Sequence, residues 1–511
     1  MRKSQIFLGT IAALSMGFYS CSNEDAPNAG GNLSQKGDKY IAVNIRTSGM
    51  TGTRAEGFEV GTDAEGTVTT GNTRFYFFDG KGKAFTMENN GNINAASGGV
   101  ISNMVQPAEV TPGNTDGNTP EGTAVLILGT PTADFQGMLP ASAICVVGLD
   151  DAGFTALQGQ DLSEVATSLS NYENENSFIM TTSNWKGAGD NGAVNIADKV
   201  KDSKEGAEGD PADFYLDRLA VRVEFKESSS NTNTNKWMFP SLDSQGNVAK
   251  YKIYKDGSQV EVGLNVVIDN WQLVNTADKS YLVKQLPATD PWTNWSDATY
   301  HRSYWAESPA TASLTNPSFD IRTANGWSAM RDKNYTNEYT QGTQTEIDLT
   351  KRGANTTAVA IKAHVEYSDG TSADIVRWAG NYYTLSDFEN LVVSSYNSES
   401  TTTEAVTTAD VKLVDEGTTY NSFKVQVKGN DYKYKAIEHW NNGVTSFYMN
   451  IANEQNMYGV VRNHIYQYEI EKVVGLGVPG NGDGPEPQKT YVAARLNVLN
   501  WKLVAKKVTL E

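Results

Sequence analysis

The chain has 511 residues, a formal net charge of −18 and only 20% charged residues. This length predicts two domains, each able to bury a core of its own. The negative charge argues against binding to nucleic acid and to anionic membrane surfaces, because like charges repel. The 46 glycines and 24 tyrosines are typical of short strands and exposed turns, and two cysteines leave no disulfide framework.

The first twenty residues predict a secretory signal peptide. Arg2 and Lys3 precede an apolar run at residues 6–16, which is too short to span a bilayer. Ser20 directly before Cys21 resembles a bacterial lipoprotein processing site, with Cys21 as the lipidated residue. The alternative is ordinary signal cleavage nearby, which leaves a free thiol. Either way, we expect an exported protein that is soluble or tethered by lipid.

A strand is predicted at residues 39–46, after a spacer rich in Asn, Gly and Ser. Ile41, Val43 and Ile45 alternate with other residues along it, which is the pattern of a strand with one buried face.

The segment that follows, residues 47–57, has the small and polar composition of a loop that a protease can bind in extended form. One interpretation is an ordinary loop with a solvated arginine. The other is cleavage between Arg54 and Ala55, which would free the first strand. Arg46 is the alternative cleavage position, although it belongs to the strand itself.

The rest of the first half predicts strands, with one helix that begins after Asp161 as its N-cap. The main strands are expected at residues 75–78, 124–128, 143–147, 219–225 and 266–273. Cys145 lies within an apolar strand and is interpreted as a buried small residue. We place the boundary between two domains at residues 287–292, where prolines and polar residues interrupt the pattern.

The second half likewise predicts strands with one helix. A strand is predicted at residues 358–367, and a helix follows Thr384, which stands three residues before Asp387 as in a capping box. Further strands are expected at residues 444–451 and 460–474.

Catalytic and metal-binding patterns are scarce. The four histidines have no metal-ligand spacing and are interpreted as structural or surface residues: His301, His364, His439 and His464. Gly475, Gly477 and Gly480 match a dinucleotide motif in form, but Pro479 excludes the helix that must receive the pyrophosphate. We therefore expect no enzyme activity, no metal and no cofactor.

The closing stretch, residues 491–511, is strand-like throughout and follows a Pro/Gly-rich spacer at residues 475–487. Its apolar residues change parity once, which predicts two strand segments joined by a bulge or bend. The first set is Leu499, Trp501 and Leu503, and the second is Val504, Val508 and Leu510. Such a strand must pair with its own sheet or with that of another molecule.

Three segments of the second half carry a resemblance to a known family: residues 458–466, 475–477 and 496–501. Together they resemble the C-terminal signature of fimbrillins from Bacteroidales type V pili, and the Arg462-Asn463-His464-Ile465-Tyr466 block is its most specific part. The whole layout, with Cys21 and Arg54, is similar to the shaft subunits of the minor fimbrium.

The resemblance implies an all-β protein with two transthyretin-like β-sandwich domains, short helices, an N-terminal pro-strand and a C-terminal donor strand. The expected plan is a signal peptide (1–20), a lipidated propeptide with the removable strand (21–54), two sandwiches (55–287 and 288–480), and a linker with the donor strand (481–511).

The resemblance also implies a route from the outer membrane to an extracellular fimbrium. An Arg-specific extracellular protease would remove the first strand, and the C-terminal strand of another copy would fill the groove. The implied partners are copies of the chain, accessory anchor and tip fimbrillins, and host or bacterial surface receptors.

Two other classes remain open. A monomeric surface lipoprotein that acts as an adhesin would keep both terminal strands in its own sandwiches. A secreted β-sandwich hydrolase is the third class, although no acid pair or triad emerges from local spacing. Within the fimbrillins, a tip subunit needs no donor strand and an anchor subunit needs no cleavage, so Arg54 together with the closing strand favours the shaft.

Overall fold

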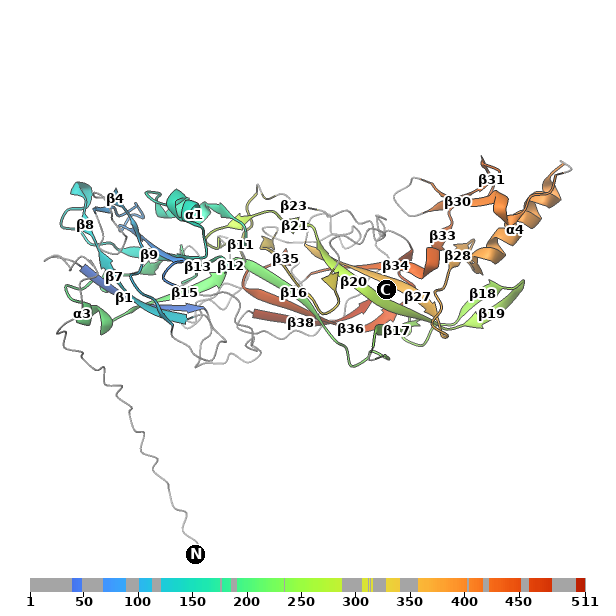
Figure 1. The fold of residues 1–511 in the computed structure, drawn as a ribbon, viewed down its shortest axis with the longest axis horizontal. Helices are drawn as coiled ribbons and strands as arrows, with labels where there is room; N and C mark the ends of the chain where they lie inside the picture. Colours follow the sequence, from blue (N-terminus) through green and yellow to red (C-terminus); the bar gives the residue numbers. More distant parts are fainter. Residues whose placement is uncertain are drawn as a thin grey trace, which may run out of the picture. The chain divides into compact units, whose positions relative to one another are not determined.

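The fold is taken from a computed structural model, shown in Figure 1. The structure describes residues 39–47, 68–88, 101–112, 121–174, 177–184, 191–233, 235–286, 306–310, 312, 314–315, 328–340, 357–401, 404–416, 422–451, 459–479 and 502–510. The chain from Gly37 to Glu511 forms one unit through its internal contacts. The described part is predominantly β-structure, in agreement with the predicted all-β sandwich class.

The first large sheet, the N-terminal sheet, follows the order β5-β2-β9-β13-β15-β1-β7-β6, with β14 paired to β9. Alternate residues of its long strands are buried in one core, which contains Phe75, Leu126 and Phe214. Its strands are β1 (Lys39–Thr47), β2 (Thr73–Phe78), β5 (Met104–Val105), β6 (Thr111–Pro112), β7 (Glu121–Leu128), β9 (Ser142–Val147), β13 (Met180–Thr182), β14 (Val194–Asn195) and β15 (Ala212–Arg218).

The second large sheet, the C-terminal sheet, follows the order β25-β16-β36-β17-β20-β27-β34-β37, with β24 paired to β20 and β38 to β36. Phe225 and Trp271 meet edge to face in its core, with ring centroids 5.0 Å apart. Its strands are β16 (Ala220–Lys226), β17 (Trp237–Leu242), β20 (Leu264–Val274), β24 (Ser328–Ala329), β25 (Lys333–Asn337), β27 (Ala358–Tyr367), β34 (Val444–Asn450), β36 (His464–Val474), β37 (Val478–Pro479) and β38 (Lys502–Leu510).

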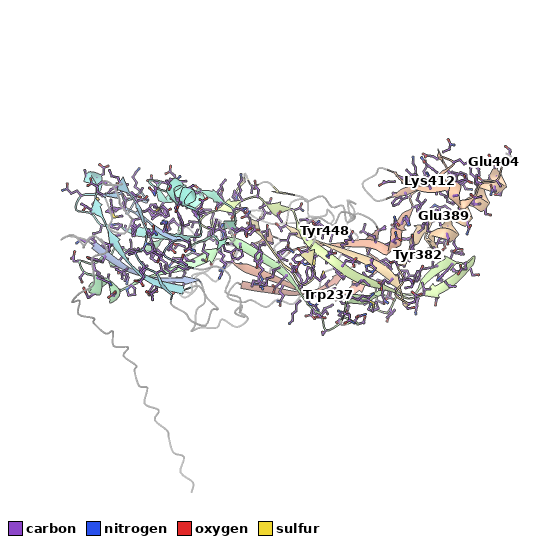
Figure 2. The ribbon with its side chains drawn as sticks, viewed as in Figure 1. Trp237, Tyr382, Glu389, Glu404, Lys412 and Tyr448 are labelled. Atoms are coloured by element: carbon purple, nitrogen blue, oxygen red, sulfur yellow. The ribbon has the colours of Figure 1, made fainter. Side chains whose placement is uncertain are left out.

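A smaller sheet in the order β19-β18-β29-β28-β33 carries the longest helix, α4 (Leu385–Glu399). The helix begins where expected, because the Thr384 hydroxyl accepts a hydrogen bond from the N–H of Asp387. Tyr382, labelled in Figure 2, meets Tyr251 edge to face at 5.6 Å. The strands are β18 (Tyr251–Lys255), β19 (Ser258–Val262), β28 (Ile375–Trp378), β29 (Asn381–Thr384) and β33 (Glu438–Trp440).

Short helices complete the described elements, and one of them was predicted. Helix α2 (Leu162–Thr167) begins at Asp161 in a capping box with Glu164, so the predicted N-cap is confirmed. The other helices are α1 (Asp151–Ala156), α3 (Lys204–Glu208), η1 (Ala133–Phe135), η2 (Thr408–Asp410) and η3 (Asn441–Gly443).

The remaining strands form small pairs and triplets. They are β3 (Met87–Glu88), β4 (Ile101–Ser102), β8 (Thr130–Pro131), β10 (Leu169–Ser170), β11 (Glu173–Asn174), β12 (Ser177–Phe178), β21 (Thr276–Ala277), β22 (Ser280–Tyr281), β23 (Leu314–Thr315), β26 (Tyr339–Thr340), β30 (Val411–Asp415), β31 (Phe423–Val427), β32 (Asn430–Asp431) and β35 (Gly459–Val460).

The two large sheets divide earlier than the expected boundary at residue 287. Strand β15 ends at Arg218 and belongs to the N-terminal sheet, whereas β16 begins at Ala220 and belongs to the C-terminal sheet. Strands β17 and β20 also lie in the C-terminal sheet, although they precede residue 287. The prolines at residues 287–292 mark a change in composition, but the partners of β16, β17 and β20 decide which sheet each strand joins.

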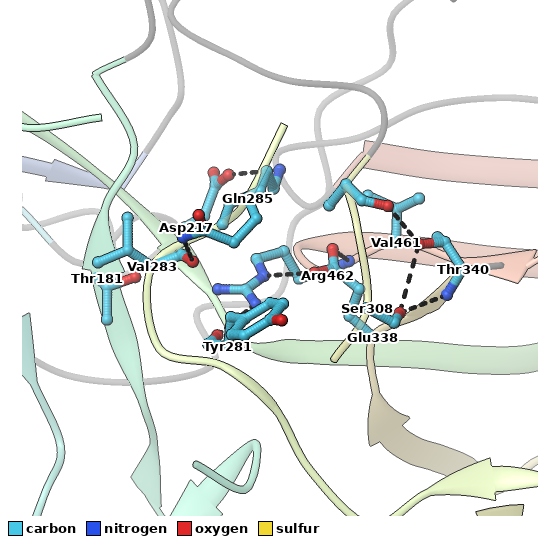
Figure 3. Close-up of polar contacts among 12 residues, drawn as sticks. Thr181, Asp217, Tyr281, Val283, Gln285, Ser308, Glu338, Thr340, Val461 and Arg462 are labelled. Atoms are coloured by element: carbon cyan, nitrogen blue, oxygen red, sulfur yellow. Dashed lines mark hydrogen bonds and ion pairs between the residues drawn. The ribbon is translucent and has the colours of Figure 1, made fainter. Parts of the chain in front are cut away.

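A buried polar network lies where the two large sheets meet (Figure 3). Arg462 is fully buried, and its Nε donates to Glu338 Oε1 at 3.1 Å. Its backbone N–H donates to the other oxygen of the same carboxylate at 2.9 Å. The terminal guanidinium nitrogens donate to the carbonyls of Leu282 at 3.0 Å and Tyr281 at 2.5 Å. The charge is therefore both paired and hydrogen-bonded, as a buried arginine requires.

Asn463 extends this network to the end of strand β15. It has a φ of 58°, which an Asn tolerates better than most residues. Its Nδ2 donates to Asp217 Oδ1 at 3.0 Å, and its Oδ1 accepts from Arg218 at 3.2 Å. Lys284 donates to the other oxygen of Asp217 at 2.9 Å, with both side chains buried.

The rest of the predicted signature is also structural. The Nδ1–H of His464 donates to the Arg462 carbonyl at 2.7 Å, and the Tyr466 hydroxyl accepts from the N–H of Val461 at 3.0 Å. Ile465 is 1% exposed. The block from Arg462 to Tyr466 thus fixes the start of β36 against the end of β15.

We predict that Glu338→Ala lowers the free energy of unfolding of the full chain by about 3–5 kcal/mol, because it leaves the Arg462 charge buried without its partner. Arg331→Ala is the matched control, since its ion pair with Glu227 has side-chain exposures of 68% and 44%. The control should cost less than about 1 kcal/mol. Denaturant unfolding measures both, and equal losses for the two variants would contradict the prediction.

Candidate functional site

Strand β1 occupies an interior position of the N-terminal sheet. It pairs antiparallel with β7 from Lys39 to Arg46, and it pairs parallel with β15 from Val43 to Thr47. Both partners come much later in the chain. Removal of β1 would leave the facing backbone groups of two strands without partners, so the sheet would hold a slot with two hydrogen-bonding edges.

The inward face of β1 is the one that the sequence indicated. Ile41 and Val43 are 1% exposed, Ile45 is 0% exposed, and all three belong to the core of the N-terminal sheet. Burial of each such side chain contributes about 1.5–3 kcal/mol. Loss of β1 would therefore open an apolar groove as well as two strand edges.

The chain between Asp198 and Asp213 makes polar contacts with β1 in addition to the pairing with β7 and β15. Tyr40 exchanges backbone hydrogen bonds with Lys201, at 2.9 Å in each direction. Lys39 forms an ion pair with Asp202. Asn44 donates from Nδ2 to Asp213 Oδ1 at 2.8 Å. These contacts are polar and largely exposed, so each stabilises β1 less than a buried apolar side chain does.

Asp210 lies in the same segment and binds two lysines. It pairs with Lys199, and Lys201 approaches its other oxygen at 3.0 Å. The hydrogen bond from Lys199 and then that from Lys201 lower the pKa of the Asp210 carboxyl below its usual value. Sequence reasoning missed this segment, because its contacts with β1 join residues more than 150 positions apart in the chain, as Lys39 and Asp202 do with a separation of 163.

The C-terminal strand β38 lies at a different place, in the C-terminal sheet. It pairs parallel with β36, from His464↔Lys502 to Val473↔Leu510. Among the described strands, β36 is the only pairing partner of β38. Leu510 is fully buried in the core of this sheet.

A bulge was expected in the closing stretch, but the described register shift uses an extra residue of β36. The pairing passes from Ile470↔Val508 to Lys472↔Thr509, so β36 contributes the additional residue Glu471. Tyr466, Tyr468 and Ile470 are core residues of one parity. The extra residue brings Val473, of the other parity, into the same core.

Several predicted site residues lie outside the described residues. They are Cys21, Arg54, Ala55, Leu499 and Trp501. Arg46 is described as a backbone position of β1, and Leu503, Val504 and Val508 as backbone positions of β38. Their roles in lipidation, cleavage and strand donation therefore stay predictions.

The described histidines have local partners. His364 Nδ1 lies 2.9 Å from both carboxylate oxygens of Asp269, and its Nε2 lies 2.9 Å from Glu366 Oε1. The hydrogen bond with Asp269 is the main cause that raises the pKa of His364. His439 lies 2.7 Å from Asp374. His301 is outside the described residues. No set of three or more His, Cys, Asp or Glu side chains in the described ranges is arranged to hold a metal ion.

Cys145 is fully buried in β9, as predicted, and burial raises the pKa of its thiol well above the usual value. A buried neutral thiol is a poor nucleophile. Across the residues that the structure covers, no helix has the length and apolar character needed to cross a bilayer.

Solved structures similar to this chain include three named as fimbrial proteins. A fimbrilin from Porphyromonas gingivalis is 10% identical, with a TM-score of 0.36 over 92% of this chain and 96% of its own. A fimbrial assembly protein from Parabacteroides distasonis is 10% identical, with a TM-score of 0.29 over 64% and 80%. A C-terminally truncated tip fimbrial protein from Porphyromonas gingivalis is 11% identical, with a TM-score of 0.25 over 65% and 79%.

No curated protein matches the sequence. The family assignment depends instead on residues 427–507, which match the family described as "Major fimbrial subunit protein type IV, Fimbrillin, C-terminal". This segment contains the Arg462–Tyr466 block, strand β36 and most of β38. Over residues 427–507, the chain therefore matches the C-terminal segment of fimbrillins.

Proposed function

We propose that this protein is a fimbrillin, the shaft subunit of a cell-surface fimbria, and that it polymerises head-to-tail by strand exchange. The observation that carries the proposal is the interior position of β1, which has a strand on each side although it is supplied by the beginning of the chain. Its loss would open a slot that only another strand can fill. As the main part of the surface fimbria, the shaft would support adhesion and colonisation.

Proteolysis after an arginine opens the slot in this proposal. Strand β1 ends at Thr47 and β2 begins at Thr73, so Arg54 lies in the connection between them. The neighbours of β2 are β5 and β9, not β1. A cut in this connection would therefore separate β1 from β2 without cutting any of the described strands.

The driving force for exchange is a gain of pairing partners. In its own sheet, β38 has β36 as its described neighbour. In the slot, the incoming strand would have β7 on one side and β15 on the other. Each net backbone hydrogen bond contributes about 0.5–1.5 kcal/mol, so transfer from a one-sided to a two-sided site favours the fibre.

The join is heterologous and does not close, so repetition produces a filament. Each subunit uses its slot for one neighbour and its donor strand for another. In this proposal the precursor is delivered to the outer membrane through the lipid on Cys21 and enters the extracellular fimbrium after cleavage. Anchor and tip fimbrillins would occupy the two ends, and surface receptors would bind the assembled fibre.

A monomeric surface adhesin is the second candidate. The observation that favours it is the pairing of β38 with its own β36, with Leu510 buried in the core. An adhesin of this kind would keep both terminal strands permanently. The two candidates therefore differ in what happens after cleavage and after loss of the closing strand.

The first prediction from this proposal concerns Arg54→Ala. The variant should accumulate as an uncleaved precursor that forms no fibres, because β1 stays in the slot. Arg46→Ala is the matched control and should be processed and assembled normally, with a mature N-terminus at Ala55. N-terminal sequencing and electron microscopy of surface protein provide the readouts. Normal fibres from Arg54→Ala would contradict cleavage at this residue.

The second prediction concerns Cys21→Ala. The variant should fold, but it should lose incorporation of labelled fatty acid and delivery to the outer membrane. Cys145→Ala is the control, since the buried thiol is not expected to carry lipid. Unchanged fatty-acid labelling of Cys21→Ala would show that another residue is acylated.

The third prediction concerns removal of residues 499–511. The shortened chain should remain a folded monomer, with a moderate loss of stability from the missing Leu510 contacts, and should not extend a fibre after cleavage. Leu503→Asp should also block extension by placing a charge in an apolar groove. Sedimentation and thermal unfolding are compared with the full chain. Fibres from the shortened chain would favour a different assembly mode.

A further inference from the structure

The two strands that would alternate in the slot have the same unusual charge. The chain as a whole carries a net charge of −18. Strand β1, KYIAVNIRT, nevertheless contains two basic residues and no acidic residue. Strand β38, KLVAKKVTL, contains three basic residues and no acidic residue. In the register derived below, residues 497–505 would occupy the slot, and Lys502 is the one charged residue among them.

The segment beside the slot has the opposite charge. Residues 198–213 contain six acidic residues against three lysines, which leaves a net charge of −3. Asp202 pairs with Lys39, the first residue of β1, and Asp213 accepts a hydrogen bond from Asn44, near the middle of the strand. Lys199 and Lys201 are engaged by Asp210. The acidic rim, as we call residues 198–213, is thus complementary to a basic strand.

The register of the incoming strand follows from side-chain size. Val43 lies between Ala124 on β7 and Ala212 on β15, both of them small and buried. Both neighbours of Val43 on the adjacent strands are therefore small, and we assign the largest donor side chain to this position. In the closing stretch, Leu499, Trp501 and Leu503 have the same spacing as Ile41, Val43 and Ile45. Alignment of the two sets puts Trp501 between the two alanines.

This alignment also determines which residue faces the acidic rim. With Trp501 in the place of Val43 and Leu503 in the place of Ile45, Lys502 takes the place of Asn44. The Asn44 side chain donates to Asp213 Oδ1 at 2.8 Å. A lysine at that position replaces a neutral donor with a charged one, which makes a stronger hydrogen bond with a carboxylate.

We infer that Asp213 is a specificity residue of the slot, which selects the C-terminal strand of a second copy through an ion pair with Lys502. The inference rests on the strand exchange proposed above and adds its register and its charge selection. The ion pair is exposed, so it contributes modestly to affinity. Its main effect is on the rate of association and on the choice between strands, because opposite charges steer encounter.

A charge exchange tests the inference in the full chain after treatment with an Arg-specific protease. Asp213→Lys alone and Lys502→Asp alone should each slow polymerisation about twofold to tenfold, as measured by light scattering at low salt. The double variant should return to within about twofold of the wild-type rate, because it restores the pair with the charges exchanged. Asp134→Lys, at an exposed position in η1, is the control for net charge and should leave the rate unchanged.

The outcomes distinguish failure of the proposed function from failure of the Asp213–Lys502 pair alone. If the processed wild-type chain forms no fibres, the proposed function itself is wrong. If it forms fibres but the double variant stays as slow as the single variants, strand exchange stands and the Asp213–Lys502 pair is refuted. If the Asp213→Lys variant does not fold, the double variant Asp213→Asn with Lys502→Gln, which has no charge at either position, takes its place in the test. Added salt should then slow the wild type more than this neutral pair, and equal slowing would also refute the pair.

A cross-link tests the register independently. Ala42 is the partner of Val125 on β7, and the alignment places Asn500 at that position. Copies with Val125→Cys and copies with Asn500→Cys should therefore form an intermolecular disulfide in the fibre. A cross-link through Thr509→Cys instead would mean that Leu510 replaces Val43, and that Lys506 rather than Lys502 faces the acidic rim.

Discussion

Two-sided pairing of β1 is the constraint on which the N-terminal sheet depends. A backbone group that is buried without a hydrogen-bond partner costs free energy, so an interior position of a sheet cannot stay empty. The first strand of the described chain fills this position between β7 and β15, which follow it by about 80 and 170 residues. In the proposed function, the strand that would be removed is thus an interior strand of the sheet and lies close in sequence to the proposed cleavage site.

The Arg462–Tyr466 block gives a second constraint, at the junction of the two large sheets. Arg462 and Asn463 precede β36, and their partners Glu338 and Asp217 come from other parts of the fold. A buried pair of this kind adds little net stability over an apolar pair of the same size. Its benefit is geometric, because Arg462 binds Glu338 through both its side chain and its backbone N–H and binds two carbonyls as well, which fixes one arrangement of the surrounding strands.

The sequence predicted local features well and long-range features poorly. The N-caps Asp161 and Thr384 and the buried alternation of Ile41, Val43 and Ile45 are local patterns, and the structure contains all of them. The partners of the signature block could not be predicted in this way. Glu338 is 124 residues from Arg462, and Asp217 is 246 residues from Asn463. The division between the two large sheets, between Arg218 and Ala220, could not be predicted from composition either, since strand partners decide it.

The parallel direction of β1 against β15 has a kinetic consequence. An antiparallel gap can be closed by a neighbouring hairpin, whereas a parallel strand must arrive through a long crossover. If the slot is opened as proposed, a replacement strand must run antiparallel to β7 and parallel to β15 at once, and the apolar groove stays exposed until such a strand arrives. Fibre length would then be governed by a competition between two rates, that of opening subunits and that of their encounter with donors.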